Sequence, residues 1–582
     1  MEIFQNYKNY KKFENDYALW KQNKDITEAK RLEYLRQNPV DDLTKKSEIQ
    51  RGKALLHAID VMDECSQTKA ENMEIATEQI VAQAGQVASY AGMGLGAVIS
   101  FLPPVQKLID KIIKKCPKIA TLAIAAPTAI ITALFALGTT VVMQAWAAKK
   151  QVGASRNGRF EAMKNELADP KNFAILTPEQ LAKQEAIVKT IPTTKDMKRG
   201  IVAKKSNMLN PLTVFKTVKD AIFNDKKLEH ERIEFDKKLN TINDKGVVLS
   251  EADILKAQKD KQLLHNIVEK IDMASQDYAE NIELATDTAS AVALGGGFLT
   301  GFLANALSKL LKIKNPIIQK GIGPFVGLIT TLAIAIGATR LQKEGARVGR
   351  YLAKKELEKN LDNFVYVDEK LSDKLTNYTK TPSTEKKNIF AFLWQAIKDN
   401  REYKKYIKTQ GVENIKKSMA LKEIELTPEQ LKEAKTLQKN TFKTFNKIDE
   451  KSQAYAESVE AVKSIIELPV AFLGGSLGAG IGALISLKMF KCLKNVSPLK
   501  AQIPIMLGTF IGILPTIFLN AHFTKEQRKA SRVAHMLALN EINDAKSFVD
   551  YDNLTLASTT PSRIQNKSRE DIINNWLKNN FY

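Results

Sequence analysis

The chain has little of the side-chain chemistry that catalysis and metal binding require. Its 582 residues include only three cysteines, with no Cys-x-x-Cys pair, and five scattered histidines. It contains no Gly-rich phosphate loop, no His-Glu-x-x-His helix and no Gly-x-Ser-x-Gly turn. The cysteine spacing argues against a zinc site and against a thioredoxin-type centre. We therefore expect no catalytic residues, no metal site and no cofactor, and a protein that is not an enzyme.

Charge is missing from six long stretches, although 26% of the chain is Asp, Glu, Lys or Arg. The stretches are 79–106, 119–148, 288–308, 321–339, 468–487 and 501–524. Each approaches or exceeds the roughly 20 apolar residues that cross a hydrocarbon core. They form three close pairs joined by short lysine-rich loops, which predicts three membrane hairpins. Long buried helices of a soluble all-α protein are the alternative.

The hairpins belong to three internal repeats, each with an acidic polar segment before the hairpin and a basic segment after it. Self-similarity at this scale indicates a repeated architecture. We predict unit 1 at 1–205 with its hairpin at 79–148, unit 2 at 206–385 with its hairpin at 288–339, and unit 3 at 386–582 with its hairpin at 468–524. The predicted fold is an all-α polytopic membrane protein. Each transmembrane or re-entrant hairpin is carried on cytoplasmic antiparallel helices.

Small residues recur at aligned positions in the first apolar helix of each hairpin. They are Gly92 and Gly96 in unit 1, Gly297 and Gly301 in unit 2, and Gly474, Gly478 and Gly482 in unit 3. Lipid offers little hydrophobic gain for helix association, so small residues favour packing by letting two backbones approach closely. We predict a helix-packing role for this stripe, with a pore lining as the alternative.

Two charged patterns flank every hairpin. The acidic one is Asp63, Glu71 and Glu74, then Asp272, Glu280 and Glu283, then Asp449, Glu457 and Glu460. The basic one is Arg156 and Arg159, then Arg347 and Arg350, then Arg532 and His535. The two helices of one antiparallel hairpin lie side by side, so we predict that the acidic and basic residues of the same unit pair with each other. A cation or ligand site at a pseudo-threefold axis is the alternative.

Each unit also opens with an amphipathic, aromatic-rich segment, which begins with Phe4, Tyr7 and Tyr10 in unit 1. Such segments can lie in the headgroup plane or form ordinary core faces, and both interpretations stay open. The strings Thr177-Pro178-Glu179-Gln180 and Thr427-Pro428-Glu429-Gln430 predict helix starts with a capping box.

The net charge of +22 predicts an acidic partner. Lys and Arg flank apolar runs, so we expect anionic lipid headgroups, with an acidic protein or a second copy of the chain as alternatives. No basic tract with interleaved aromatics predicts nucleic-acid binding. The first 20 residues lack a secretory signal pattern, and an even number of spans puts the large polar segments on one side. We expect an integral protein of the inner or plasma membrane, with both termini in the cytoplasm.

The function that these features predict is a non-enzymatic membrane scaffold. Its Gly stripes would hold helices together, and its basic segments would bind lipid or a partner. The alternative is a channel or transporter with a pathway at the pseudo-threefold axis. The absence of ionisable residues from the apolar stretches argues against proton coupling.

Overall fold

The computed structural model describes residues 2–115, 120–195, 197, 225–241, 249–310, 316–367, 389–492, 519 and 522–549. The described part of the chain is helical and contains no strand, which confirms the all-α class.

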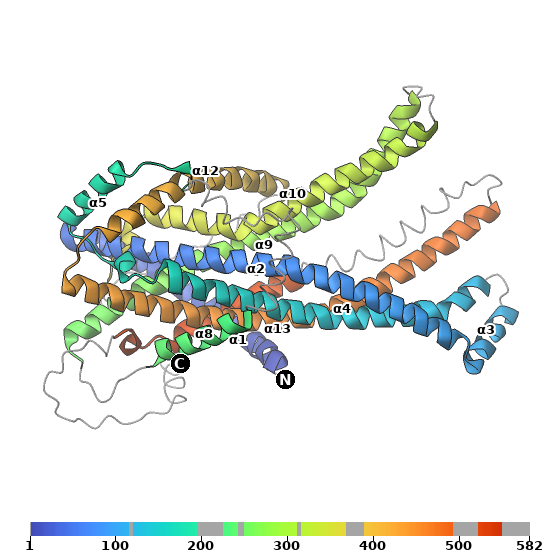
Figure 1. The fold of residues 1–582 in the computed structure, drawn as a ribbon, viewed down its shortest axis with the longest axis horizontal. Helices are drawn as coiled ribbons and strands as arrows, with labels where there is room; N and C mark the ends of the chain where they lie inside the picture. The colour runs from blue at the N-terminus through green and yellow to red at the C-terminus, as the bar shows by residue number, and fades with distance from the viewer. Residues whose placement is uncertain are drawn as a thin grey trace.

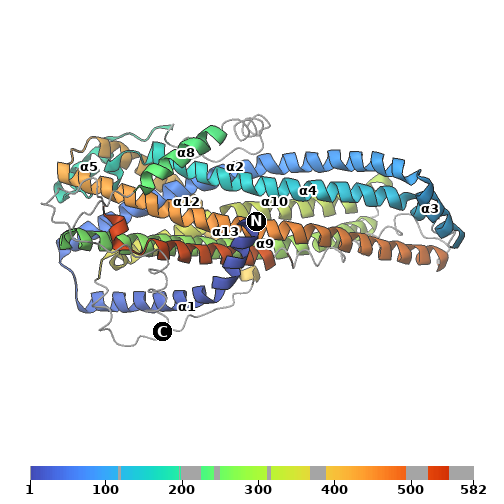
Figure 2. The ribbon, with the colours of Figure 1, turned by 90° about the horizontal axis from the view of Figure 1, so that it is seen from below.

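Long antiparallel helix pairs dominate the fold. In unit 1, α2 (Asp42–Ser100) packs along α4 (Ala120–Glu161), with the short α3 (Pro103–Lys115) between them. In unit 2, α9 (Glu251–Leu310) packs along α10 (Pro316–Lys359), and in unit 3 α13 (Pro428–Cys492) lies beside the helix at 522–541. One half of the α2/α4 and α9/α10 pairs packs into a shared helical body and the other half projects from it, as does the end of α13 (Figures 1 and 2). The projecting ends of α2/α4 and α9/α10 lie well apart in Figure 1.

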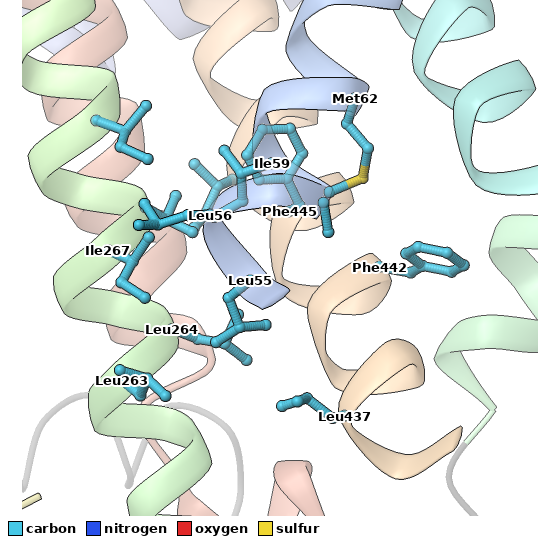
Figure 3. Close-up of a cluster of buried hydrophobic side chains, with 14 of the residues drawn as sticks. Leu55, Leu56, Ile59, Met62, Leu263, Leu264, Ile267, Leu437, Phe442 and Phe445 are labelled. Carbon is cyan, nitrogen blue, oxygen red and sulfur yellow. The ribbon is translucent and has the colours of Figure 1, made fainter. Parts of the chain in front are cut away.

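The core of the body lies where α2, α9 and α13 meet. Leucine, isoleucine and phenylalanine side chains from these three helices face one another (Figure 3). Leu55 and Ile59 of α2, Leu264 and Ile267 of α9, and Leu437 of α13 are at most 1% exposed. These residues recur at helical spacing, so each entering helix buries one apolar stripe against the other two.

Each return helix ends at a 3-10 turn that buries a phenylalanine. The turns are η3 (Pro170–Phe173), η4 (Leu361–Phe364) and η5 (Ala545–Phe548). The Phe173 ring packs edge-on against Phe442 of unit 3, and the Phe548 ring packs against His265 of unit 2. A Cβ added at Gly52 of unit 1 would lie 2.5 Å from Phe364. Every unit therefore places its phenylalanine against the entering helix of the preceding unit in a closed cycle.

The opening helix of unit 1 belongs to the body. α1 (Glu2–Gln37) buries Tyr10 against unit 3, where Val459, Phe523 and Val533 contact it. This burial assigns the aromatic face of α1 to the protein core rather than to a headgroup layer. In α12 (Ile389–Lys422), which opens unit 3, Tyr403 is buried. The corresponding segment of unit 2, at 212–223, lies outside the described residues.

The two predicted helix starts are confirmed. Thr177 and Gln180 form a capping box at the start of α5 (Pro178–Thr190), and Thr427 and Gln430 make the same reciprocal hydrogen bonds at the start of α13. The Gln180 and Gln430 amides also bond to each other at 2.9–3.1 Å, which joins unit 1 to unit 3.

Of the described residues, one helical stretch, 130–166, is long and apolar enough to cross a membrane. A second candidate is the bent pair of Gln83–Ser100 and Pro103–Lys114, whose axes differ by 79°. Six spans in three units therefore remain a prediction, and much of the second and third hairpins lies outside the part whose side chains are described.

Candidate functional site

The return helix of each unit carries two neighbouring stripes, one small and one basic. In unit 1 the small stripe faces the entering helix of the same hairpin. The Ser66 and Ser155 hydroxyl oxygens lie 2.7 Å apart. A Cβ added at Gly158 would lie 2.5 Å from the carbonyl oxygen of Cys65. The hairpin therefore closes through small residues at this level.

The other units repeat this contact at aligned positions. Ser275 donates to the carbonyl oxygen of Ala346 at 3.1 Å, and a Cβ on Gly349 would lie 2.9 Å from the Cα of Ser275. In unit 3, the Ser452 and Ser531 hydroxyls are hydrogen-bonded.

The basic stripe faces the neighbouring unit, which corrects the predicted pairing within each hairpin. Arg156 and Arg159 each follow a small residue by one position, and one position turns a helix by about 100°. Ser155 and Gly158 face α2, and the two arginines reach α13 of unit 3, where Arg156 bonds to Gln453 and Arg159 pairs with Asp449. Arg159 also donates to the Ser66 hydroxyl of α2 at 3.4 Å. The prediction placed the right residue types on adjacent helices but chose the wrong partner helix for the arginines. The ion pairs within the hairpins join lysines of the entering helix to glutamates of the return helix, as in Lys69–Glu161 and Lys270–Glu356.

An outer layer of charged contacts links the units in a cycle. Arg347 of unit 2 contacts Glu64 at 2.9 Å and Glu71 at 2.6 Å, both on α2 of unit 1. Arg532 of unit 3 contacts Glu280 of unit 2 at 3.1 Å. Arg156 of unit 1 donates to the Gln453 side chain of unit 3 at 3.0 Å. Three equivalent arginines thus hold three equivalent interfaces.

An inner layer repeats the cycle nearer the apolar core. Asp63, Asp272 and Asp449, which we call the axial carboxylates, each face an arginine or histidine side chain from the next unit. Arg350 lies 3.8 Å from Asp63, His535 Nδ1 lies 2.9 Å from Asp272, and Arg159 pairs with Asp449. Arg159, Arg350 and His535 are all buried. Because a lone buried charge is strongly unfavourable, the pairing across units ties the three hairpins to one another.

The axial carboxylates line a small cavity of about 40 Å³ with Ile59, Ile271, Ile448 and other core residues. The pKa of Asp63 is raised to about 7, mainly by burial and also by the neighbouring Asp272 and Asp449 carboxylates, against the lowering effect of Arg350 and Arg159. Within the described residues, no group of three or more His, Cys, Asp or Glu side chains is arranged to hold a metal ion. The site therefore combines converging carboxylates with paired cations rather than with a metal geometry.

The predicted glycine stripe is described fully only in the first hairpin. A Cβ on Gly92 would lie 2.7 Å from the Cα of Thr132, and a Cβ on Gly96 would lie 2.7 Å from the Cα of Thr128. Both glycines therefore lie where the α2 and α4 backbones approach closely. Gly482 is buried on α13. The surroundings of Gly297, Gly301, Gly474 and Gly478 lie outside the described part.

The remaining predicted acidic residues lie beyond the two charged layers. Glu74 and Glu457 are half-buried on α2 and α13. Glu460 accepts a hydrogen bond from Gln527 of its own hairpin at 3.3 Å. The side chain of Glu283 lies outside the described residues.

The sequence prediction missed two acidic partners, Glu64 and Asp277, which pair with Arg347 and Arg532. They occupy different repeat positions, so aligning the repeats could not find them. The available signal was helical spacing, because Glu64 lies two turns before Glu71 and Asp277 lies one turn before Glu280, which puts each pair on one helix face.

The prediction also missed a trough of about 710 Å³ between α2, α10 and α12. Tyr351, Tyr403 and Tyr406 form one wall, with the Tyr351 and Tyr406 ring centres 4.7 Å apart. The cations Arg347, Arg350 and Lys354 along it are paired with acidic side chains. The trough is large enough for a small molecule, but its charges are internally balanced.

Comparison with protein-family models, with curated proteins and with solved structures gives no match to this chain.

Proposed function

We propose that the protein is a non-enzymatic membrane scaffold. Its helical body holds three hairpins at fixed positions, and the projecting ends of these hairpins enter a bilayer. The observation that carries the proposal is the distribution of exposed apolar side chains. In α2 and α4, the large apolar residues that face solvent lie on the projecting half except for Leu43, and they include Val87, Tyr90, Val98, Ile130, Leu134 and Val142. A contiguous exposed apolar surface of this kind indicates a membrane or protein interface.

The two layers of charged contacts also support the scaffold proposal. They lie at the base of the hairpins, directly above the apolar core of the body, and they join the three units in a closed cycle. Buried ion pairs are better evidence for a specified geometry than for high stability. A scaffold needs a specified geometry, because its function is to keep the hairpins in register.

In the part of the chain that is described, the pseudo-threefold axis offers little space for an ion or solute to pass. Below the axial carboxylates it is filled by the apolar core, and the cavity among those carboxylates is only about 40 Å³. The projecting ends of α2/α4 and α9/α10 also diverge (Figure 1). These observations favour the scaffold over a channel or transporter with a pathway on the pseudo-threefold axis.

Spin-label accessibility in proteoliposomes tests the proposal. Single cysteines replace Val98 and Val142, which are 63% and 67% exposed on the hairpin, and Leu43, which is 77% exposed on the body. We expect labels at 98 and 142 to be accessible to oxygen but not to a nickel chelate, and the label at 43 to be accessible to the chelate. If all three positions are equally accessible to the chelate, the hairpin is not in lipid and the proposal is wrong.

A further inference from the structure

The tip of the first hairpin carries a short helix with distinct faces. α3 follows directly on the end of α2, and its axis is turned from that of α2 by 79°. Ile109 is buried at this tip, where α3 packs against α4. Leu108 and Ile112 are exposed, as are the lysines at 107, 111 and 114.

These side chains divide the surface of α3 into three stripes. Leu108 and Ile112 are four positions apart and share one stripe. Lys107, Lys111 and Lys114 occupy the side opposite Ile109, at about 100° per residue. A helix with an exposed apolar stripe beside a lysine face is typical of segments that lie in the plane of a membrane surface.

The hairpin is long enough to carry α3 across a bilayer. The charge-free part of α2 runs from Gln79 to Ser100. At 1.5 Å per residue this length is about 33 Å, which exceeds a hydrocarbon core of about 30 Å. A shallow re-entrant hairpin would leave the α3 lysines inside the core, where each costs about 2.5–3.5 kcal/mol on insertion scales.

We propose that α3 lies in the headgroup layer of an anionic leaflet, on the side of the membrane opposite the helical body, and thereby holds the first hairpin across the bilayer. The partner is a lipid surface, because the lysine face complements anionic headgroups while Leu108 and Ile112 reach the acyl boundary. This inference rests on the proposed function, since it requires the hairpin to be in lipid. Arg159 and Arg347 at the base of the hairpins are not available to bind headgroups, because they are buried in contacts between units.

A nitroxide scan of α3 tests the proposal in the full-length protein. Single cysteines are placed at each position from 106 to 114 after Cys65, Cys116 and Cys492 are replaced by Ser. The protein is reconstituted in phosphatidylcholine vesicles containing about one third phosphatidylglycerol. We expect oxygen accessibility to peak at 108 and 112 and nickel-chelate accessibility to peak at 107, 111 and 114. The labels at Val98 and Val142 report separately whether the hairpin is in lipid.

The outcomes separate the two proposals. Lipid-exposed labels at 98 and 142 with uniform aqueous accessibility along α3 would overturn the surface helix but leave the scaffold standing. Uniform burial of α3 in lipid would overturn it in favour of a re-entrant tip. Aqueous labels at 98 and 142 would overturn both proposals.

A charge variant tests the anionic leaflet. The triple substitution Lys107→Gln, Lys111→Gln and Lys114→Gln is compared with the control Lys404→Gln, Lys405→Gln and Lys408→Gln, which removes the same charge from exposed positions of α12. Each lysine near an anionic surface contributes about 1 kcal/mol, so the ratio of surface-bound to detached α3 should fall roughly 100-fold in the first variant and stay unchanged in the control. Equal behaviour of the two variants, or the same α3 accessibility in vesicles of phosphatidylcholine alone, would overturn the anionic assignment.

Discussion

Replacing Arg347 by Met should destabilise the protein by removing one of the contacts that join unit 2 to unit 1. The guanidinium is 6% exposed and contacts Glu64 at 2.9 Å and Glu71 at 2.6 Å. Met keeps the apolar length of the side chain, so the substitution removes the charge and hydrogen bonds with little change in volume.

The magnitude follows from the burial of the partners. Removing one member of a fully buried pair costs about 3–5 kcal/mol, because the other charge stays buried without a partner. Here the side chains of Glu71 and Glu64 are 15% and 32% exposed, so water reduces the cost. We expect the free energy of unfolding to fall by about 2–3 kcal/mol. Arg36, 75% exposed and paired with Glu33 one turn away, is the control. Its replacement by Met should cost less than about 0.5 kcal/mol.

A double-mutant cycle identifies the partner of Glu71. Glu71→Gln is combined with Arg347→Met across units and, separately, with Arg156→Met within the hairpin. Unfolding by urea in mild detergent, followed by helical circular dichroism, gives the four free energies of each cycle. We expect a coupling energy of about 1–3 kcal/mol for the pair across units and less than about 0.5 kcal/mol for the pair within the hairpin.

The reverse order of the two coupling energies would refute the reasoning. It would mean that the basic stripe faces its own hairpin, as the sequence pattern alone predicts, and that the cyclic closure does not hold in solution. A charge reversal provides an independent check. Arg347→Glu with Glu71→Arg should be more stable than either single variant, because the pair is restored in the opposite sense.

Three further predictions concern the axis, the first hairpin and the core. The pKa of Asp63 is raised from 3.8 to about 7, so the folded protein binds this proton more tightly than the unfolded chain, and its contribution to stability is present below about pH 4 and lost as the pH rises through 7. This pH dependence of stability can reach about 4 kcal/mol, and Asp63→Asn should flatten it. A native protein whose unfolding temperature is unchanged between pH 4 and 8 would contradict the prediction. Gly96→Ala places a Cβ 2.7 Å from the Thr128 backbone and should lower the free energy of unfolding by about 1–3 kcal/mol. The control Gly94→Ala, on the same helix, meets nothing within 4 Å and should leave stability unchanged or raise it by up to about 1 kcal/mol. Equal unfolding free energies of the two variants in detergent would show that α2 and α4 are not closely packed. Phe364→Ala should lower the free energy of unfolding by about 3–5 kcal/mol, because the ring is 2% exposed and packs on Gly52 of the preceding unit, and a loss below about 1 kcal/mol in urea titration would argue against that contact.

Much of the architecture follows from local patterns in the sequence. The sequence could predict the helices and the capping boxes at Thr177 and Thr427, because these depend on residues close together in the chain. It could also predict that the phenylalanines at the ends of the three return helices are equivalent, because they recur at corresponding positions of the repeat. The acidic and basic stripes were also visible, since they recur at aligned positions. Glu64 and Asp277 were not, because they break the alignment while occupying the same helix face.

Only the tertiary structure decided which helix each stripe faces. Antiparallel pairing within a hairpin and cyclic pairing between units both bring an acidic helix beside a basic one, so composition cannot distinguish them. The choice depends on the rotation of the return helix about its own axis. That rotation is determined by Ser155 and Gly158, whose small size lets α4 close on α2 and places Arg156 and Arg159 in contact with α13 of unit 3. The sequence by itself determined the helical class and predicted three units with matched charges, and the packing of the small residues decided that the arginines pair across these units.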